Sequence, residues 1–421
     1  MKSFIRKKIR ALRKVDPHPL HVNAQPPAYD IPEVLEIGCR QSGLSGVRLN
    51  LLIPALSLKF SFGGINTAID FFMSLSIQDS DIRIIITDEV ESDLLGLPCR
   101  NDWTLYKADD DDTTGKIIVC FGDRYNKSIP IRKNDVFVAT AWWTAYNGYL
   151  IQKWQEHHWQ IKAKPLVYLI QDFEPAFYKW SSRYFLSLGT YLESNVLPVI
   201  NTKLLSDFIA QNGIKFNEYY IFEPSLNKTL ASSLTRLGHS PRKKRIIIYG
   251  RPSVERNAFE LLAKGLELWS WRYSNAKEWE IISLGETYPS MVLGNKLSIN
   301  VKGKVSLQEY ADLLVSSAVG VSLMISPHPS YPPLEMAAFN LGVLTNSFYN
   351  KDLSEYHQNI KSLDILTPDS IAKGVADLCN MFEIDSEYFE KNTFVSNYFV
   401  NQSTTFNFIT ELRNKVLSQN E

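Results

Sequence analysis

The sequence predicts an α/β protein made of two successive, Rossmann-like, doubly wound parallel sheets. From about residue 48 onward, short and almost wholly apolar runs alternate with helical stretches, which is typical of βαβ units whose strands are buried on both faces. A polar stretch at residues 222–242 interrupts the pattern, which then resumes. The length of 421 residues fits this division, because a domain usually has about 100–200 residues.

The first predicted domain covers residues 46–230. Its strands are expected at 49–53, 82–87, 117–121, 136–140, 166–170 and 196–200, where apolar residues are nearly continuous. Helices are expected after Gly63-Gly64, over 148–159 and over 202–211. Gly213 supplies the stop of the last helix, because glycine readily adopts the left-handed conformation that ends a helix.

The second predicted domain covers residues 231–395. Its strands are expected at 246–249, 279–284, 297–301, 319–324 and 343–345, and its helices at 258–273, 307–317 and 334–341. Ser306 and Glu309 predict a capping box at the second of these helices. Residues 396–421 are expected to form a C-terminal helix that packs back on the first domain, and residues 1–45 an extended arm.

Composition excludes several functional classes. Basic and acidic residues balance at 45 each, but residues 1–14 hold seven basic residues and no acid. The remaining residues include 38 basic and 45 acidic side chains, a net charge of −7. This charge argues against a nucleic-acid partner. The four cysteines are scattered and include no CxxC pair, so neither disulfides nor a structural zinc site is predicted. This use of cysteine predicts a reducing, cytoplasmic location. No apolar run is long enough for a membrane span or a signal peptide.

The basic arm has two interpretations. Ile5, Ile9 and Leu12 lie at i, i+4 and i+7 among the lysines and arginines of residues 1–14. This spacing is typical of an amphipathic helix that contacts anionic lipid, and it would place the protein peripherally on the inner face of a membrane. A solvated basic tail is the alternative.

Parallel sheets bind ligands beyond the carboxyl ends of their strands, so two facing sheets predict a cleft between the domains. Gly63-Gly64 follows the first strand, where it either lets the backbone approach a ligand or forms a plain tight turn. In the second sheet, Arg251 follows Gly250 directly after a strand, and Arg256 and Lys304 follow nearby. These cations are expected to bind phosphate oxygens, the alternative being pairs with surface carboxylates.

The stretch 321–345 is the most informative. A buried strand ends in a Pro/Ser/His loop, a helix begins near Pro332-Pro333, and Glu335 is expected in its first turn. Proline suits the first turn of a helix, where its missing N–H is not needed. The free N–H groups of such a helix start can hold a phosphate, and Glu335 can accept hydrogen bonds from a ribose diol.

Together these motifs resemble the large retaining glycosyltransferase family 4, which has the GT-B fold. They are the early Gly-Gly, Gly-Arg with a basic residue five positions later, Gly-Lys before an amphipathic helix, and Leu-Glu-Met-Ala followed by Gly-Val-Leu-Thr. The stretches 139–146, 168–180 and 325–335 are similar to the WsaF-type rhamnosyltransferases that build bacterial cell-surface (S-layer) rhamnans.

The resemblance implies a set of residue roles. Arg251, together with either Arg256 or Lys304, would clamp the diphosphate of a nucleotide sugar and stabilise the leaving group, and Glu335 would bind the ribose. The donor site would comprise Gly63, Gly64, Gly250, Arg251, Arg256, Gly303, Lys304, His328, Ser330, Tyr331 and Glu335. One departure concerns the family's Glu-x7-Glu pattern, because Pro327 stands eight residues before Glu335. His328, Ser330 or Tyr331 could replace the missing carboxylate, or a deoxy sugar needs less of that contact.

Residues after the strands of the first domain are expected to face the acceptor. They are Trp142, Trp143, Gln171, Asp172 and Glu174. An aromatic face suits the C–H surface of a sugar, although a tryptophan here could equally be core. Asp172 is the favoured carboxylate for an acceptor hydroxyl or its proton. Its alternative roles are a helix N-cap or a pair with Lys179 or Arg183.

The predicted reaction transfers L-rhamnose from dTDP-L-rhamnose to a growing, lipid-linked rhamnan, with retention and without a metal or other cofactor. Fixed cations and N–H groups can stabilise the leaving diphosphate, and no metal-ligand spacing is evident. Asp109–Asp112 is interpreted as a solvated loop. The alternatives are a GT-B enzyme that uses another nucleotide sugar and a non-catalytic glycan-binding subunit.

Overall fold

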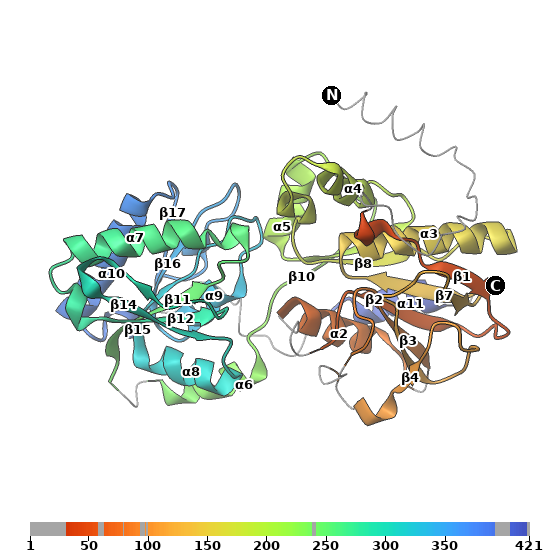
Figure 1. Cartoon of the computed structure of the whole chain (residues 1–421), viewed down its shortest axis with the longest axis horizontal. Helices are drawn as coiled ribbons and strands as arrows, with labels where there is room; N and C mark the ends of the chain where they lie inside the picture. The colour runs from red at the N-terminus through yellow and green to blue at the C-terminus, as the bar shows by residue number, and fades with distance from the viewer. Residues whose placement is uncertain are drawn as a thin grey trace.

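The computed structural model describes residues 31–57, 63–78, 80–92, 97, 100–237, 241–391 and 405–418. They form two α/β domains side by side, each built on a parallel sheet (Figure 1). The predicted fold class is confirmed. The basic arm of residues 1–14 lies outside the described residues. No helix in the described ranges is long and apolar enough to cross a membrane.

The sheet of the N-terminal domain contains every strand that the sequence predicts there. Its order is β10-β9-β8-β7-β2-β3-β5-β4, and all neighbours are parallel. The bounds are β2 (Arg48–Ile53), β3 (Asp81–Ile86), β4 (Thr104–Tyr106), β5 (Lys116–Cys120), β7 (Asp135–Ala139), β8 (Leu166–Ile170), β9 (Val196–Asn201) and β10 (Tyr220–Phe222). A separate parallel pair joins β1 (Gly38–Gln41) to β6 (Ser128–Ile131). The short edge strands β4 and β10, and this pair, are additions to the prediction.

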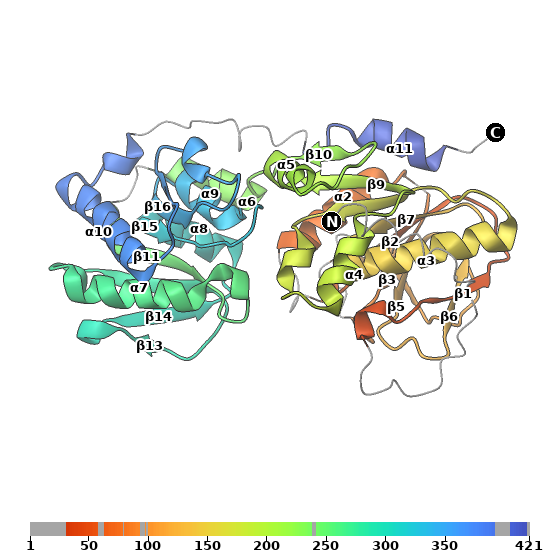
Figure 2. The same ribbon diagram turned by 90° about the horizontal axis from the view of Figure 1, so that it is seen from above.

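Helices cover both faces of this sheet. The α2 (Gly63–Leu75) and α11 (Ile409–Leu417) helices share one apolar core. The α3 (Trp142–Trp159), α4 (Ser182–Thr190) and α5 (Lys203–Gln211) helices pack on the other core. Figure 2 shows α11 along the N-terminal domain, although the chain passes through the other domain first. Helix α3 begins six residues before the predicted start at 148, so Trp142 and Trp143 lie in its first turn.

The second sheet has the order β13-β14-β12-β11-β15-β16-β17, and only β13 is antiparallel. Its strands are β11 (Lys243–Gly250), β12 (Glu280–Gly285), β13 (Met291–Val292), β14 (Ser298–Gly303), β15 (Ser317–Val321), β16 (Gly342–Asn346) and β17 (Ile360–Leu363). The predicted strand 319–324 ends at Val321, and the N–H of Met324 donates instead to the side chain of Asn346 at 2.8 Å.

The helices of the second domain are α6 (Lys228–Ser233), α7 (Phe259–Arg272), α8 (Leu307–Ser316), α9 (Tyr331–Ala338) and α10 (Pro368–Ile384). Ser306 caps α8 by accepting from the N–H of Glu309 at 3.1 Å. The other half of the predicted capping box is replaced, because the Glu309 carboxylate accepts from Lys302 at 2.7 Å. Short 3-10 helices are η1 (Pro32–Val34), η2 (Arg100–Asp102), η3 (Glu174–Phe177), η4 (Leu234–Arg236), η5 (Glu255–Asn257), η6 (Ala276–Glu278), η7 (Gly294–Lys296), η8 (Leu353–Glu355) and η9 (Tyr388–Glu390).

The predicted domain boundary at residue 230 needs a correction. Leu226 and Leu230 are buried in the same core as Ile247 of β11 and Ile282 of β12. Helix α6 therefore belongs to the C-terminal domain, which begins near Leu226. The polar stretch at 222–242 conceals this, because α6 is short and contributes few apolar residues.

The interpretation of Asp109–Asp112 as a solvated loop is wrong for Asp112. Its side chain is 3 % exposed and forms ion pairs with Arg48 and Arg132. The Arg48 side chain is fully buried and also donates to both oxygens of Asp135, at 2.9 and 2.7 Å. With Asp81 and Arg83, these residues form a charge network near the amino ends of β2, β3 and β7, called here the amino-end network. Asp109–Asp111 remain exposed, as predicted.

Candidate active site between the two domains

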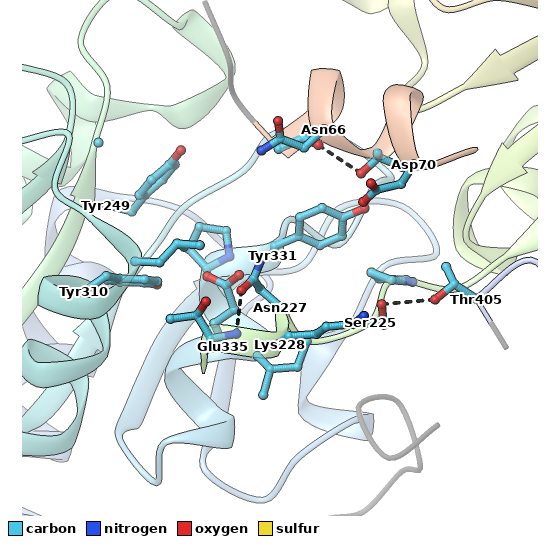
Figure 3. A pocket seen from close by; sticks show the side chains of 18 of the residues that line it. Asn66, Asp70, Ser225, Asn227, Lys228, Tyr249, Tyr310, Tyr331, Glu335 and Thr405 are labelled. Atoms are coloured by element: carbon cyan, nitrogen blue, oxygen red, sulfur yellow. Dashed lines mark hydrogen bonds between the residues drawn. The ribbon is translucent and has the colours of Figure 1, made fainter. Parts of the chain in front are cut away.

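A cavity of about 970 Å³ lies between the two domains. It is bordered by the start of α2 from the N-terminal domain and by the ends of β11, β12 and β14 and the start of α9 from the C-terminal domain. Figure 3 shows Asn66 and Asp70 of α2 on one side and Tyr249, Tyr310 and Glu335 on the other. Of the predicted site residues, the cavity is lined by Gly63, Gly303, Lys304, Tyr331 and Glu335.

Glu335 is a half-buried acid directed into this cavity (Figure 3). Helix α9 begins at Tyr331, so Glu335 lies one turn further along the helix than predicted. Burial raises the pKa of Glu335 to about 7, and the adjacent Tyr310 hydroxyl offsets part of this rise. A carboxyl group that titrates near neutrality inside a cavity is suited to accept hydrogen bonds from ligand hydroxyls once it is ionised.

Glycines bring two candidate cations to the ends of their strands. A Cβ at Gly250 would lie 2.5 Å from Ser283 Oγ, and one at Gly303, where φ is +67°, would lie 2.2 Å from Thr287 Oγ1. Both positions therefore require glycine. Arg251 and Lys304 follow these glycines at the ends of β11 and β14, which flank β12 in the sheet. Lys304 is exposed at the cavity wall.

Arg256 lies on η5, immediately before α7. Its Nε lies 3.5 Å from Asp172 Oδ2 of the other domain. Its guanidinium carbon lies 4.1 Å from the centre of the Phe177 ring. Arg256 therefore faces the N-terminal domain in this structure, and its charge is held by a carboxylate and an aromatic ring.

Asp172 joins the two domains. It accepts a hydrogen bond from the hydroxyl of Ser326, which lies in the loop after β15. The alternative partner Arg183 instead donates to Glu33 at 3.1 Å. The Asp172 side chain is 13 % exposed. It is thus the carboxylate of the N-terminal domain that reaches the loop between β15 and α9.

That loop contains a buried histidine. His328 Nδ1 accepts from the N–H of Ser330 at 3.0 Å, and burial lowers the pKa of His328 to about 4. The ring is therefore neutral near pH 7, with its proton on Nε2, and Nε2 has no hydrogen-bond partner among the described residues. Ser330 is the N-cap residue of α9 with φ of +67°. The Tyr331 hydroxyl accepts from Asn201 of β9 at 2.8 Å, a further contact between the domains.

Two of the predicted acceptor residues occupy different environments from those expected. Trp142 is fully buried, and its Nε1 donates to the Tyr178 hydroxyl at 2.9 Å. No sugar can stack on it, so its predicted acceptor role is wrong, because the helix begins at Trp142 and turns the ring into the core. Glu174 is 7 % exposed and accepts from the Tyr168 hydroxyl at 2.6 Å. Burial raises the pKa of Glu174 to about 8, so this acid is protonated at neutral pH.

Trp143 and Gln171 lie beyond the carboxyl ends of β7 and β8. The half-buried Trp143 donates from Nε1 to Asp88 at 3.1 Å. Gln171 donates from Nε2 to the carbonyl of Gly64 at 3.0 Å. Gln171 therefore positions the turn that starts α2.

Several cavity residues were absent from the prediction. They are Asn66, Thr67, Asp70, Ser225, Asn227, Lys228, Tyr249, Tyr310 and Thr405. Burial raises the pKa of Asp70, and the charge of Lys228 opposes that rise. The polar spacing of Asn66, Asp70 and Ser74 on one face of α2 is a signal that sequence could have supplied. Ser225 and Thr405 are far apart in the sequence and come together only in the folded chain, where Thr405 Oγ1 donates to Ser225 Oγ at 3.1 Å.

Over the described ranges, no group of three or more His, Cys, Asp or Glu side chains is arranged to hold a metal ion. Metal independence stays a prediction.

Comparisons with known proteins agree with this architecture. Residues 48–203 match the family described as "WsaF, N-terminal domain", and residues 244–376 match "WsaF, C-terminal domain". A curated relative, the O-antigen biosynthesis protein RfbC of Myxococcus xanthus, is 30 % identical over 212 residues. The matched region is half of this chain but only 15 % of that protein.

Solved structures show the same fold at low sequence identity. Sucrose-phosphate synthase from Thermosynechococcus elongatus has a TM-score of 0.53 at 10 % identity, covering 90 % of this chain and 94 % of its own. HepE of Anabaena, solved in complex with UDP, has a TM-score of 0.53 at 9 % identity, covering 89 % and 96 %. A glycosyltransferase from Rickettsia africae has a TM-score of 0.52 at 12 % identity, covering 89 % and 100 %.

Proposed function

The chain belongs to the WsaF family and has the GT-B fold, and from this premise we propose that it is a glycosyltransferase of glycan biosynthesis that transfers L-rhamnose from dTDP-L-rhamnose to a growing rhamnan. The observation that carries the proposal is the interdomain cavity, which places a titrating carboxyl group, a lysine and the start of a helix around one space. The donor would lie there, with its ribose at Glu335 and its diphosphate toward Arg251 and Lys304.

The positive charges at the site favour the departure of a diphosphate from the donor sugar. In the reaction the bond between the sugar's anomeric carbon and the diphosphate oxygen breaks, and a bond from that carbon to an acceptor hydroxyl oxygen forms. Negative charge then develops on the diphosphate, and fixed cations stabilise it most in the transition state. Arg251 and Lys304 supply these cations from the ends of β11 and β14. The proposed reaction is retaining and needs no metal.

Asp172 is the proposed contact for the acceptor. It comes from the acceptor-side domain, reaches Ser326 and Arg256 across the cleft, and retains some solvent exposure. An acceptor hydroxyl that enters here can donate to this carboxylate, which positions the oxygen and takes up its proton. Glu174 is less suited to this role because it is buried and protonated near pH 7.

The loop between β15 and α9 suits a deoxy sugar. Pro327 occupies the place of the first carboxylate of the Glu-x7-Glu pattern, so one charged contact to a sugar hydroxyl is missing. His328 Nε2 is a buried donor with no hydrogen-bond partner among the described residues, and a sugar hydroxyl could satisfy it. A sugar that lacks a hydroxyl needs fewer such contacts.

The proposal is tested by nucleotide-sugar binding and transfer. The purified protein is heated with dTDP, UDP or GDP and with their sugars, and transfer to a synthetic rhamnose oligosaccharide is followed by mass spectrometry. We expect the largest stabilisation with dTDP-L-rhamnose, since a ligand at about 100 times its Kd adds about 2.7 kcal/mol.

Two outcomes would contradict it. Preferential binding and turnover of another nucleotide sugar would change the donor while leaving the enzyme class intact. Oligosaccharide binding without turnover of any donor would identify a glycan-binding subunit.

A further inference from the structure

Trp180 is the most exposed large hydrophobic side chain in the described residues, at 93 %. Phe185, on the same segment, is 50 % exposed. Burial of an aromatic side chain usually stabilises a fold substantially, so neither ring contributes much to this one. Their exposure calls for an explanation outside the core.

The local structure keeps both rings at one end of α4. Ser181 is the N-cap and accepts from the N–H of Tyr184 at 3.3 Å. Trp180 and Phe185 therefore occupy the N′ and N4 positions. In many helices the side chains at these two positions pack together as a hydrophobic staple. At 93 % exposure the indole is not covered by such a contact. Ser187 and Thr190 of α4 are buried and Leu188 packs against the core, so Phe185 lies on the outer side of the helix.

This end of α4 continues directly from the catalytic cleft. Phe177 packs on Arg256 of the other domain, and Tyr178 accepts from Trp142 behind it. Trp180 follows Phe177 by three residues, which is at most about 10 Å of chain. Figures 1 and 2 both show α4 on the side of the N-terminal domain that faces the C-terminal domain.

The surroundings of the two rings are polar and nearly neutral. Lys179, Ser181 and Ser182 are exposed beside Trp180, and the charge of Arg183 is paired with Glu33. Isolated aromatic faces with hydroxyl neighbours suit a pyranose, whose C–H face packs on the ring while its hydroxyls meet polar groups. A membrane surface would favour more unpaired basic residues and a larger apolar area.

We propose that Trp180 and Phe185 form an acceptor platform, a surface that binds sugar units of the acceptor chain outside the cleft. The unit that receives the new sugar lies at Asp172, and earlier units extend past Phe177 onto the platform. This inference rests on the proposed function for the identity of the sugar. The 6-methyl group of rhamnose adds apolar surface for such contacts.

The test compares Trp180→Ala and Phe185→Ala with Trp271→Ala, a matched control at an exposed tryptophan of the other domain (65 % exposed). Synthetic rhamnose oligosaccharides of increasing length serve as acceptors and, without donor, as ligands in calorimetry. Each platform substitution should raise KM and Kd for the longer chains by roughly 2- to 10-fold, the scale of one aromatic contact. The loss should grow with acceptor length, Trp180→Phe should restore most of it, and Trp271→Ala should match the wild type.

The outcomes separate the platform from the proposed function. Oligosaccharide binding that depends on Trp180, in a protein that does not use dTDP-L-rhamnose, would keep the platform and reject the donor. Turnover in which both platform variants behave like Trp271→Ala would reject the platform, as would the absence of any oligosaccharide binding by the wild type. Loss of binding to phosphatidylcholine–phosphatidylglycerol vesicles in Trp180→Ala, with glycan binding intact, would assign the surface to a membrane instead.

Discussion

The two ends of the N-terminal sheet use charged residues in opposite ways. At the amino ends, Arg48 and Arg132 are paired with Asp112, Asp135 and Asp81 and are almost fully buried. At the carboxyl ends, Asp172 is partly exposed and its side-chain partners, Arg256 and Ser326, belong to the other domain. The amino-end network is complete within one domain, whereas the cleft charges depend on the other domain or face a cavity. Acidic and basic residues at the ends of strands are therefore candidates for chemistry only where the fold leaves room for a ligand.

The largest expected effect tests the amino-end network. Arg48→Met removes a buried guanidinium and leaves Asp135 and Asp112 without their shared partner. Removing one member of a buried ion pair costs about 3–5 kcal/mol, and we expect a loss of this size in the free energy of unfolding. Denaturant titration measures it. A loss below about 1 kcal/mol would show that the network is not a stabilising element.

The matching change on the cleft side is Arg251→Ala, just after the carboxyl end of β11 in the C-terminal domain. We expect turnover to fall by roughly 10²-fold or more, because a transition-state contact to the diphosphate is lost. The free energy of unfolding should change little, in contrast to its loss in Arg48→Met. Steady-state kinetics and denaturation of the same preparation give both values, and near-normal turnover would remove Arg251 from the catalytic groups.

Glu335 tests whether a cleft carboxyl group binds ribose. Glu335→Gln should weaken nucleoside diphosphate binding by about 1–3 kcal/mol, the contribution of a charged hydrogen bond. The pKa of Glu335 is raised to about 7, so wild-type affinity should fall as the pH drops through this value and the carboxylate becomes protonated. Calorimetry across this range checks both expectations, and an unchanged affinity with the same pH profile in the variant would contradict them.

Glu174 gives a smaller, pH-dependent effect on stability. Its pKa is raised by burial from 4.5 to about 8 in the folded chain, so the folded state holds the proton more tightly than the unfolded state. This contribution to stability is complete below the unfolded pKa and is lost as the pH rises through about 8. Glu174→Gln, which is always neutral, should lose less stability between about pH 4.5 and 8 than the wild type. Parallel slopes in thermal melts would contradict the assignment.

The smallest expected effect is that of a chelator. If fixed cations alone stabilise the diphosphate, excess EDTA should leave turnover unchanged. The measurement is the transfer rate before and after dialysis against EDTA. Loss of activity that Mg²⁺ or Mn²⁺ restores would contradict metal independence.

Much of the fold can be predicted because strands buried on both faces appear as continuous apolar runs. Each predicted strand of both sheets is present. The prediction was less complete toward the C-terminus, where it omitted α10. Thr367-Pro368 and the spacing of Ile371, Val375 and Leu378 are signals of that helix. The edge strands are too short to show a period.

The candidate site could be predicted only in part. Arg251, Lys304 and Glu335 can be predicted from the sequence, because the glycines before the two cations and the prolines at the helix start are local signals. Asp112 follows exposed acids in the sequence, and the arginines that bury it are distant along the chain. The link between Asp172 and Arg256 depends on how two separate domains meet, which no local pattern encodes.

The return of α11 to the N-terminal domain makes the C-terminal domain an insertion within its partner. The chain leaves after β10 and comes back by Thr405, whose hydroxyl meets Ser225 beside the outgoing strand. Ser225 and Thr405 thus bring the two ends of this insertion together on the cavity wall. A rotation of the domains about this contact would widen or narrow the cavity while two connections keep the domains joined.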